Sequence, residues 1–484
     1  MQISEVILGP PGCGKTTALI AKLTSLVEMG QDPARIGIAS FTKTAAAEIS
    51  NRAGASHTKI GTLHSMAYRL AEIDGDQVID REWLIQFSGE CGIKTQGVGK
   101  QEIEELNEGD AYLALNSYMG ATRQTDPTAA FLDAPCEGTL EKWLYWYESY
   151  NAFKKAYGVI DFNDMLADAI GANPEIDVLI LDESQDFSPL QWELIEGMLP
   201  YVQEVVIAGD DDQAIYKWSG ADPHGMAKFI EKHKSTVTVL SQSYRVPRDV
   251  HELAEFLIGH IDERLEKKYE PRDADGQVSS VGTFSMLHLR EDQDTMILVR
   301  NHSLRSDIED TLMRKGIAYG AEGGYPAPLK NRYAQCINSW LQAKKSNEHM
   351  GHAALTQKQL RQLSGNARGL YKQRVMSDAE GLLEEGITWQ RLLQIPSHFH
   401  HYYGRILNKH RTLNPETKIR ICTMHASKGR EADRVIVVNG MGARTAQAFE
   451  NDRDSEYRTF YVAITRSRDI LDIVQDANGL DMLT

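Results

Sequence analysis

Cysteine is scarce in this sequence of 484 residues, which contains only five cysteines. They lie far apart, at positions 13, 91, 136, 336 and 422, and no two of them form a C-x-x-C pair. An odd number of scattered cysteines argues against a disulfide framework, a structural zinc site and an iron–sulfur cluster. We therefore expect the protein to reside in a reducing compartment, the cytoplasm.

Long hydrophobic runs are also missing. No apolar stretch approaches the ~18 residues that cross a bilayer, so we expect no membrane partner. The first residues, MQISEVILGPPG, lack the basic region and the cleavage site of a signal peptide and are typical of a strand that leads into a loop. With 42% hydrophobic and 25% charged residues, the composition is that of a globular protein, and the length favours about three structural units.

Basic residues are fewer than acidic ones, and the formal net charge is −16. Taken alone, this value disfavours nucleic acid as a partner. The charge is unevenly distributed, however: residues 72–141 contain 15 acidic and 4 basic residues, whereas residues 326–375 contain 9 basic residues and 1 acidic residue. The second segment would attract a polyanion, although two solvated faces of opposite charge would give the same pattern.

The sequence near the N-terminus carries a nucleotide-binding motif. An apolar strand is followed by a G-x-x-x-x-G-K-[ST] loop, GPPGCGKT, and then by an amphipathic helix. In such a loop, backbone N–H groups and the helix N-terminus face the phosphates of ATP, Lys15 reaches the β- and γ-phosphates, and the Thr16 hydroxyl ligates Mg²⁺. The expected nucleotide contacts are Gly9, Pro10, Gly12, Cys13, Gly14, Lys15, Thr16 and Thr17.

A second apolar strand ends in an acidic pair. The sequence VLILDESQD places Asp182 and Glu183 directly after four apolar residues. On its own, such a pair is often a solvated loop. Next to a phosphate-binding loop, it predicts that Asp182 holds Mg²⁺ and that Glu183 polarises the attacking water.

Eight stretches occur in an order that resembles the UvrD/Rep/PcrA group of superfamily 1 DNA helicases, and together they extend over nearly the whole chain. They are GPPGCGKTT (9–17), IASFTKTAAAEISNR (38–52), GTLHSMAYRL (61–70), LDESQDFSPLQ (181–191), IAGDDDQAIYKWSGAD (207–222), LSQSYRVPRDV (240–250), ICTMHASKGREADRVIVV (421–438) and YRTFYVAITRSR (457–468).

The resemblance implies an α/β fold of two RecA-like P-loop NTPase lobes with parallel sheets, each lobe carrying a mainly helical insertion. Independently, residues 295–320 have the pattern strand–helix–strand, which favours a parallel sheet. The expected domains are a first lobe (1–70 and 150–235), an acidic insertion (71–149), a second lobe (236–325 and 414–484) and a basic insertion (326–413).

The resemblance also implies roles around ATP, which would lie between the lobes. Gln213 is expected to sense the γ-phosphate. Arg245 and Arg466 match the arginine fingers that the opposite lobe supplies to stabilise the transferred phosphoryl group. Tyr244 is expected to stack on the base, and Glu431 to bind the ribose.

For single-stranded DNA, the resemblance implies that Tyr216 and Trp218 stack on bases, a contact worth ~1–3 kcal/mol per base. Either ring could instead belong to the core. The other expected DNA contacts are Phe41, Thr42, Thr62, His64, Thr423 and His425, where a core position is the alternative for Phe41 and both histidines. Trp143, Trp146, Tyr147 and Tyr150 form a helical stripe that favours packing over base contact.

The function that follows from the resemblance is that of an ATP-dependent DNA helicase or translocase that moves 3′→5′ on single-stranded DNA and acts at single-strand/duplex junctions, with replication or repair proteins as further partners. Three alternatives remain: a 5′→3′ motor, a translocase that strips proteins or remodels DNA intermediates and unwinds weakly, and a non-catalytic nucleotide-binding scaffold. Some positions depart from the family pattern: only eight residues precede Gly9, Arg430 replaces a leucine, and Ser219 stands where an arginine is frequent.

Overall fold

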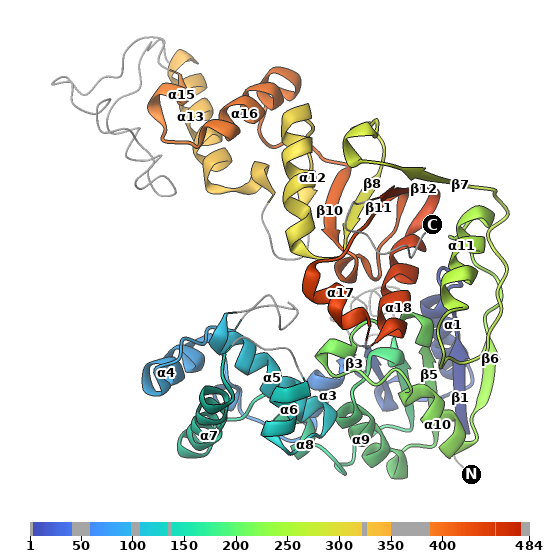
Figure 1. Ribbon diagram of the computed structural model, residues 1–484. Coiled ribbons are helices and arrows are strands. Elements are labelled where there is room, and N and C mark those ends of the chain that lie inside the picture. The colour runs from blue at the N-terminus through green and yellow to red at the C-terminus, as the bar shows by residue number, and fades with distance from the viewer. Residues whose placement is uncertain are drawn as a thin grey trace. The chain divides into compact units, whose positions relative to one another are not determined.

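The computed structural model describes residues 3–40, 59–97, 107–133, 138–321, 327–349, 388–450 and 452–475. The chain divides into two compact units, one of Met1–Asp275 with Gln447–Thr465 and one of Gly276–Ala446 with Arg466–Thr484. Each unit is built on a six-stranded sheet (Figure 1). Among the described residues, no helix combines the length and the apolar character that a membrane span requires.

The sheet of the first unit has the strand order β3-β2-β4-β5-β1-β6, and every pairing in it is parallel. Its central strands are runs of valine, isoleucine, leucine and alanine, as expected where helices cover both faces of a sheet. Because the strands are parallel, their carboxyl ends meet at one edge. The strands are β1 (Ile3–Leu8), β2 (Ile36–Ser40), β3 (Lys59–Thr62), β4 (Val178–Asp182), β5 (Glu204–Gly209) and β6 (Thr236–Val239).

Alternate side chains of the first sheet enter two different cores. Val178 and Ile180 pack with leucines of α1 on one face, whereas Leu179 and Leu181 pack with α3, α8 and α9 on the other. The helices of this unit outside its insertion are α1 (Lys15–Glu28), α3 (Leu63–Leu70), α8 (Phe162–Asp168), α9 (Pro189–Met198), α10 (Gly225–His233), α11 (Arg248–Ile258) and α18 (Arg453–Ile464).

The acidic insertion of the first unit is helical where it is described, and it has its own aromatic core. Its helices are α4 (Arg81–Cys91), α5 (Glu108–Thr122), α6 (Pro127–Asp133) and α7 (Leu140–Tyr157). On α7, Trp143, Trp146 and Tyr150 are fully buried, and Trp146 stacks on Tyr150 with ring centroids 4.8 Å apart. The packing role of this stripe is therefore confirmed, and these three rings are not surfaces for bases.

The second unit repeats the arrangement with the strand order β7-β12-β11-β8-β10-β9, and all its strand pairs are parallel. The predicted strand–helix–strand at 295–320 is confirmed as β8, α12 and β9. The elements are β7 (Gln277–Val281), β8 (Thr295–Val299), α12 (His302–Lys315), β9 (Gly320–Ala321), α13 (Arg332–His349), α15 (Trp389–Leu392), α16 (Ser397–His410), β10 (Ile419–Thr423), β11 (Ala432–Asn439), α17 (Ala443–Phe449) and β12 (Ser467–Gln475).

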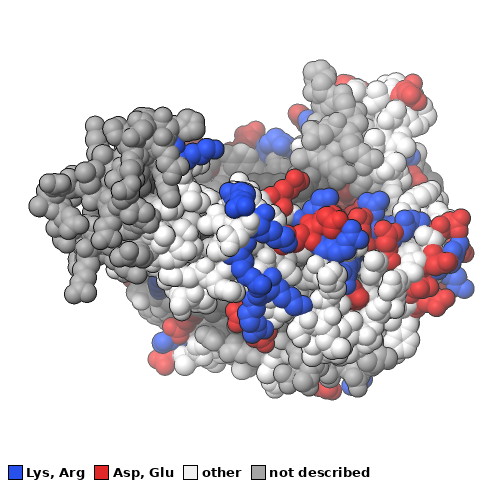
Figure 2. Space-filling model, turned by 90° about the horizontal axis from the view of Figure 1, so that it is seen from above, with Lys and Arg blue, Asp and Glu red and all other residues white. Residues whose placement is uncertain are grey.

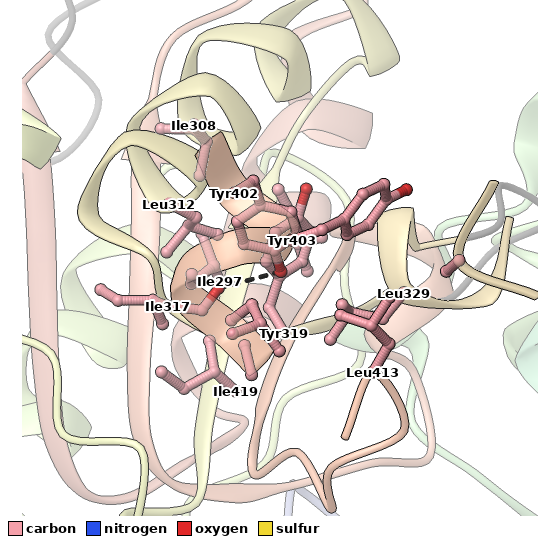
Figure 3. Packing of buried hydrophobic residues seen from close by; sticks show 14 of the residues in the cluster. Ile297, Ile308, Leu312, Ile317, Tyr319, Leu329, Tyr402, Tyr403, Leu413 and Ile419 are labelled. Atoms are coloured by element: carbon pink, nitrogen blue, oxygen red, sulfur yellow. Dashed lines mark hydrogen bonds between the residues drawn. The ribbon is translucent and has the colours of Figure 1, made fainter. Parts of the chain in front are cut away.

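The described part of segment 326–413 shares one hydrophobic core with the second sheet. Figure 3 shows Tyr402 and Tyr403 of α16 among Ile297 of β8, Leu312 of α12 and other aliphatic side chains. Both tyrosine hydroxyls are used inside this core: that of Tyr402 donates to the carbonyl of residue 317 over 3.1 Å, and that of Tyr403 to the carbonyl of residue 328 over 2.9 Å. Helix α16 is therefore anchored to the sheet by packing and by hydrogen bonds.

The units differ from the expected lobes at two places. Residues 236–275 were expected to open the second lobe, but they belong to the first unit, where β6 pairs with β1. Residues 447–465 were also expected in the second lobe, yet they belong to the first unit, where α18 packs on α11. The sequence reveals a strand or a helix by its periodicity, but it does not reveal which sheet or helix that element joins.

Candidate functional site

The phosphate-binding loop connects β1 to α1 at the carboxyl edge of the first sheet. Gly12 and Gly14 have positive φ angles of 74° and 79°, which glycine adopts without strain. The ammonium group of Lys15 donates to the carbonyl oxygen of Gly9 over 2.7 Å, so the lysine folds back across the loop. The loop thus has the glycines and the lysine position that a phosphate cradle requires.

Cys13, inside this loop, is buried and has a thiol that stays protonated. Burial raises the pKa of Cys13 to about 12, and the nearby Lys15 only partly opposes this effect. Because the thiolate is the nucleophilic form, the thiol is unsuited to covalent chemistry. Its contribution to a nucleotide site would come from its backbone.

Arg245 lies beside this loop within the same unit, and not on the opposite lobe as expected. The chain leaves β6 next to β1, with the backbone N–H of Leu240 donating to the carbonyl of Leu8 over 2.8 Å. It then passes the loop, where the N–H of Tyr244 donates to the carbonyl of Gly12 over 3.0 Å. A Cβ placed on Gly12 would lie 2.5 Å from the Cβ of Arg245. Arg245 lies on this side because β6, which precedes it, pairs with β1.

The acidic pair lies at the end of β4, two strands away from β1: Asp182 is the last residue of the strand and Glu183 follows it. Asp182 is 1% exposed, and its Oδ1 accepts the N–H of Glu183 over 3.0 Å. Glu183 has a left-handed backbone with φ 54° and ψ 40°, an uncommon conformation for a non-glycine residue. The turn brings the carboxylate of Glu183 to the Nε2 of Gln185, which donates to it over 2.6 Å.

Gln185 connects the ends of two neighbouring strands. Its Oε1 accepts the backbone N–H of Asp210, just after β5, over 2.9 Å. The Oδ2 of Asp210 in turn accepts from the Nε2 of Gln213 over 2.6 Å. Glu183 and Gln213 are thus joined by a continuous chain of hydrogen bonds. Gln185 lies within the DESQD stretch, but the sequence predicts no role for it, because a buried amide has no distinctive pattern.

The residues fit Mg²⁺ bound together with a nucleotide. Within the described part of the chain, no group of three or more His, Cys, Asp or Glu side chains could hold a metal ion. Magnesium needs no such cage, because it keeps several waters and binds through one or two protein oxygens plus substrate phosphates. The hydroxyl of Thr16 and the carboxylate of Asp182 are donors of that kind.

Tyr216 and Trp218 follow 3-10 helix η6 (Asp211–Gln213), Tyr216 as the N-cap of the next 3-10 helix, η7 (Lys217–Ser219), and Trp218 within it. Both side chains are half-buried. The two rings meet edge to face, with centroids 6.3 Å apart. Between them, Lys217 pairs with Asp452 over 2.6 Å, which fixes the turn against the start of α18. Neither ring belongs to the clusters that pack on the two faces of the first sheet, and both side chains are partly exposed.

Two of the other expected DNA contacts in the first unit, Thr62 and His64, lie at the end of β3 and in α3. Thr62 caps α3, because its hydroxyl accepts the N–H of Ser65 over 3.2 Å. Burial lowers the pKa of His64 to about 4, so the imidazole is neutral at physiological pH and its contact would be a hydrogen bond rather than an ion pair. Phe41 and Thr42 lie outside the described residues.

The remaining candidates lie in the second unit, close to the ends of β10 and β12. Thr423 ends β10, and its hydroxyl accepts the N–H of Ala426 over 3.3 Å, next to His425. Glu431 pairs with Arg468 over 3.3 Å. Arg466 donates from Nη1 to the carbonyl of Arg430 over 3.5 Å. His425 and Glu431 therefore lie in the loop that joins β10 to β11, Thr423 lies just before it, and Arg466 contacts it.

Tyr244, the expected contact of the base, is 73% exposed. Its backbone is hydrogen-bonded to the phosphate-binding loop while its ring faces solvent. A ring in this position is available to stack on a flat ligand.

Models of two protein domains match the sequence. Residues 2–234 match the UvrD/REP helicase N-terminal domain, and residues 331–476 match the UvrD-like helicase C-terminal domain. The two matches fall one in each unit for most of their length, and the first includes the phosphate-binding loop, the acidic pair and the segment of Trp218.

Individual relatives are distant in sequence. ATP-dependent DNA helicase PcrA of Leuconostoc citreum is 23% identical over 66% of this chain and 48% of its own length. DNA helicase II of Escherichia coli is 26% identical over 66% and 49%, respectively, and ATP-dependent DNA helicase Rep of Salmonella typhimurium is 25% identical over 66% and 53%. The chain thus spans about half the length of these relatives.

Proposed function

The chain belongs to the UvrD/Rep-like helicases of superfamily 1, and from this premise we propose that it hydrolyses ATP to move along single-stranded DNA and to separate the strands of a duplex. The observation that carries the proposal is the chain of hydrogen bonds from Glu183 through Gln185 and Asp210 to Gln213, beside the phosphate-binding loop. A non-catalytic nucleotide-binding scaffold has no need for such an arrangement.

In the proposed site, backbone amides of residues 9–17 and the ammonium of Lys15 bind the phosphates of ATP. Thr16 and Asp182 hold Mg²⁺, which neutralises charge on the transferred phosphoryl group. Glu183 accepts a proton from the attacking water. Gln213, which donates to Asp210 in the chain of hydrogen bonds that leads to Glu183, senses the γ-phosphate.

Four further residues complete the proposal for ATP. The neighbourhood of Arg245 and Gly12 supports Arg245 as an arginine finger, and the exposed ring of Tyr244 supports a role in stacking on the base. The family motifs support Arg466 as a second arginine finger and Glu431 as a ligand of the ribose.

For DNA, we assign base stacking to Tyr216 and Trp218, and contacts in the strand-binding groove to Phe41, Thr42, Thr62, His64, Thr423 and His425. Movement in the 3′→5′ direction and action at single-strand/duplex junctions follow from the family resemblance. Replication or repair proteins remain the proposed partners, in a reducing cytoplasm. We assign one RecA-like lobe with its insertion to each of the two units, Met1–Asp275 with Gln447–Thr465 and Gly276–Ala446 with Arg466–Thr484.

A basic cavity supports a further DNA contact in the second insertion. It has a volume of about 640 Å³, and the described residues that line it include Lys330, Lys345, Arg411 and several amides but no acidic side chain. Figure 2 shows one face, on which Lys and Arg lie beside Asp and Glu in a band to the right of the centre. We assign the cavity to the backbone of the duplex, because phosphates favour clustered cations.

The decisive experiment measures ATP turnover with and without a single-stranded oligonucleotide, and strand displacement on duplexes with 3′ or 5′ tails of DNA or RNA. We expect stimulation by DNA and displacement from a 3′ tail. The variant Glu183→Gln should bind ATP normally but lose nearly all turnover. ATP turnover that is indifferent to oligonucleotides would contradict the proposal, and displacement from 5′ tails alone would reverse the assigned direction.

A second candidate is a translocase that strips proteins from DNA and unwinds weakly. It is favoured by the short second insertion, whose α16 is packed into the core of the second unit. Displacement of streptavidin from biotinylated single strands, without separation of a duplex under the same conditions, would identify this activity.

A further inference from the structure

Three consecutive aspartates, Asp210, Asp211 and Asp212, follow β5 and are almost completely buried, with exposed fractions of 0%, 3% and 0%. Burying one carboxylate is costly, and burying three next to one another is tolerated only where cations and hydrogen bonds compensate. The sequence gives no sign of such compensation, because no basic residue lies within the triplet or directly beside it.

The compensating cation is Lys267, more than fifty positions further along the chain. Its side chain is 2% exposed, and its ammonium lies 3.2 Å from Oδ1 of Asp210, 2.6 Å from Oδ1 of Asp211 and 2.7 Å from Oδ2 of Asp212. Arg264 adds a two-pronged contact to Asp212, with Nε at 2.8 Å and Nη2 at 2.5 Å. A single lysine therefore touches all three carboxylates.

Lys267 and Asp212 keep their charges, whereas burial raises the pKa of Asp211 above its ordinary value. Burial by itself lowers the pKa of Lys267, but the three carboxylates outweigh burial and the pKa is raised. Burial likewise raises the pKa of Asp212, yet Arg264 and Lys267 reverse this effect, and the pKa lies below its ordinary value. The lysine is therefore a cation and Asp212 an anion at neutral pH.

Helix α18 closes the cluster from another part of the chain. Arg458 donates from Nε to the backbone carbonyl of Asp211 over 3.0 Å and from Nη2 to that of Glu263 over 2.7 Å. The backbone N–H of Leu265 donates to Oδ2 of Asp211 over 2.7 Å. The end of β5 is thus held by the segment around residue 265 and by α18, all within the first unit.

The cluster meets the candidate catalytic network at one carboxylate. Asp210 receives Lys267 at Oδ1 and Gln213 at Oδ2, and its backbone N–H binds Gln185, the partner of Glu183. We propose that Lys267 is a positioning residue for ATP hydrolysis, which fixes the carboxylate of Asp210 so that Gln213 and Gln185 are held in place. This inference rests on the proposed function of the site.

A purely structural role would predict a different result from a positioning role. If Lys267 acts through Asp210, its loss should lower kcat while leaving the KM for ATP nearly unchanged. Among the described residues, its ammonium contacts the three aspartates and the carbonyl of Leu265, not the phosphate-binding loop. If it only stabilises the fold, any folded variant should retain full turnover.

The test compares Lys267→Met with Lys268→Met, a control on the exposed neighbouring lysine. Because Lys267→Met leaves three carboxylates with one cation fewer, the double variant Lys267→Met/Asp211→Asn restores the charge balance and supports folding. We expect kcat of both variants with Lys267→Met to fall by about tenfold or more, as for other small displacements in catalytic sites. The control should retain wild-type kcat, and all three variants should keep the KM for ATP.

A second comparison asks whether the effect travels through Gln213. In a Gln213→Ala background, adding Lys267→Met/Asp211→Asn should lower kcat by less than about twofold, because residues of one network are not additive. Full turnover of the double variant would overturn the positioning role of Lys267 but not the proposed function. A fall in kcat that is just as large in the Gln213→Ala background would do the same. A wild-type protein without ATP turnover would instead overturn the proposed function and this inference with it.

Discussion

Replacing Gln185 with glutamate exchanges one NH₂ group for an oxygen at the centre of the hydrogen-bond chain. In the wild-type protein, the Nε2 of Gln185 donates to the carboxylate of Glu183 over 2.6 Å, and Gln185 is fully buried. In Gln185→Glu, two carboxyl oxygens would meet at this distance. The acceptor for the backbone N–H of Asp210 is retained, so the substitution acts mainly on Glu183.

The size of the effect follows from Coulomb's law. At an effective dielectric constant of about 20, two carboxylates about 3 Å apart repel by roughly 5 kcal/mol, or about four pKa units. Because Glu183 is only half-buried, solvent reduces this repulsion. We therefore expect the pKa of Glu183 to rise by about one to two units. Since the proposed base works as a carboxylate, a raised pKa means that activity is reached only at higher pH.

The assay is kcat/KM for ATP between about pH 4 and pH 9, in which the acidic limb reports the base of the free enzyme. The acidic limb of Gln185→Glu should move to higher pH by about one to two units. Gln86→Glu is the matched control, because Gln86 donates to Glu90 over 3.0 Å in the same way but on an exposed face of α4. An unchanged profile in Gln185→Glu would refute the view that Gln185 sets the state of Glu183.

Three other outcomes are expected. In Gly12→Ala, the new Cβ would lie 2.5 Å from that of Arg245 at a φ of +74°, so nucleotide binding should weaken at least about tenfold. The measurement is a titration with a fluorescent ATP analogue. In the control Gly30→Ala, the φ is +92° but the Cβ would meet no other atom, so binding should stay intact. Trp218→Ala should keep basal ATP turnover but require roughly 5- to 150-fold more oligonucleotide for stimulation, and unchanged stimulation would contradict stacking. Tyr402→Phe leaves a buried carbonyl without its donor and should lower the free energy of unfolding by about 1–3 kcal/mol in urea titrations, and an unaltered midpoint would argue against the hydrogen bond.

Much of the nucleotide site could be predicted because its signals are local. The phosphate-binding loop and the Asp182–Glu183 pair each lie within about ten consecutive residues that also define a strand and a turn. The family resemblance added Arg245 and Gln213. Once the sheet is parallel, the ends of β1, β4 and β5 must lie at one edge, so the position of these motifs followed from the fold class.

The parts that could not be predicted depend on contacts between distant segments. No pattern in residues 236–245 indicates that β6 joins the first sheet. For that reason, the prediction that Arg245 belongs to the second lobe was wrong. The aspartates after β5 would be assigned to a solvated turn by their charge, although Lys267 and Arg264 bury them. A pairing over some fifty residues has no periodicity to reveal it.

The net charge of −16 is a poor guide to the surface that DNA would meet. The three aspartates after β5 are buried against Lys267 and Arg264, and other carboxylates are neutralised where they stand, such as Asp177 by Arg35 at 2.6 Å. Such charges enter the formal sum but contribute little to the field outside the protein. A cavity lined by Lys330, Lys345 and Arg411 is not compensated in this way among its described neighbours. An acidic protein can therefore present a cationic site to phosphates, and its affinity for DNA should fall steeply as salt rises, by a slope set by these few cations rather than by the net charge.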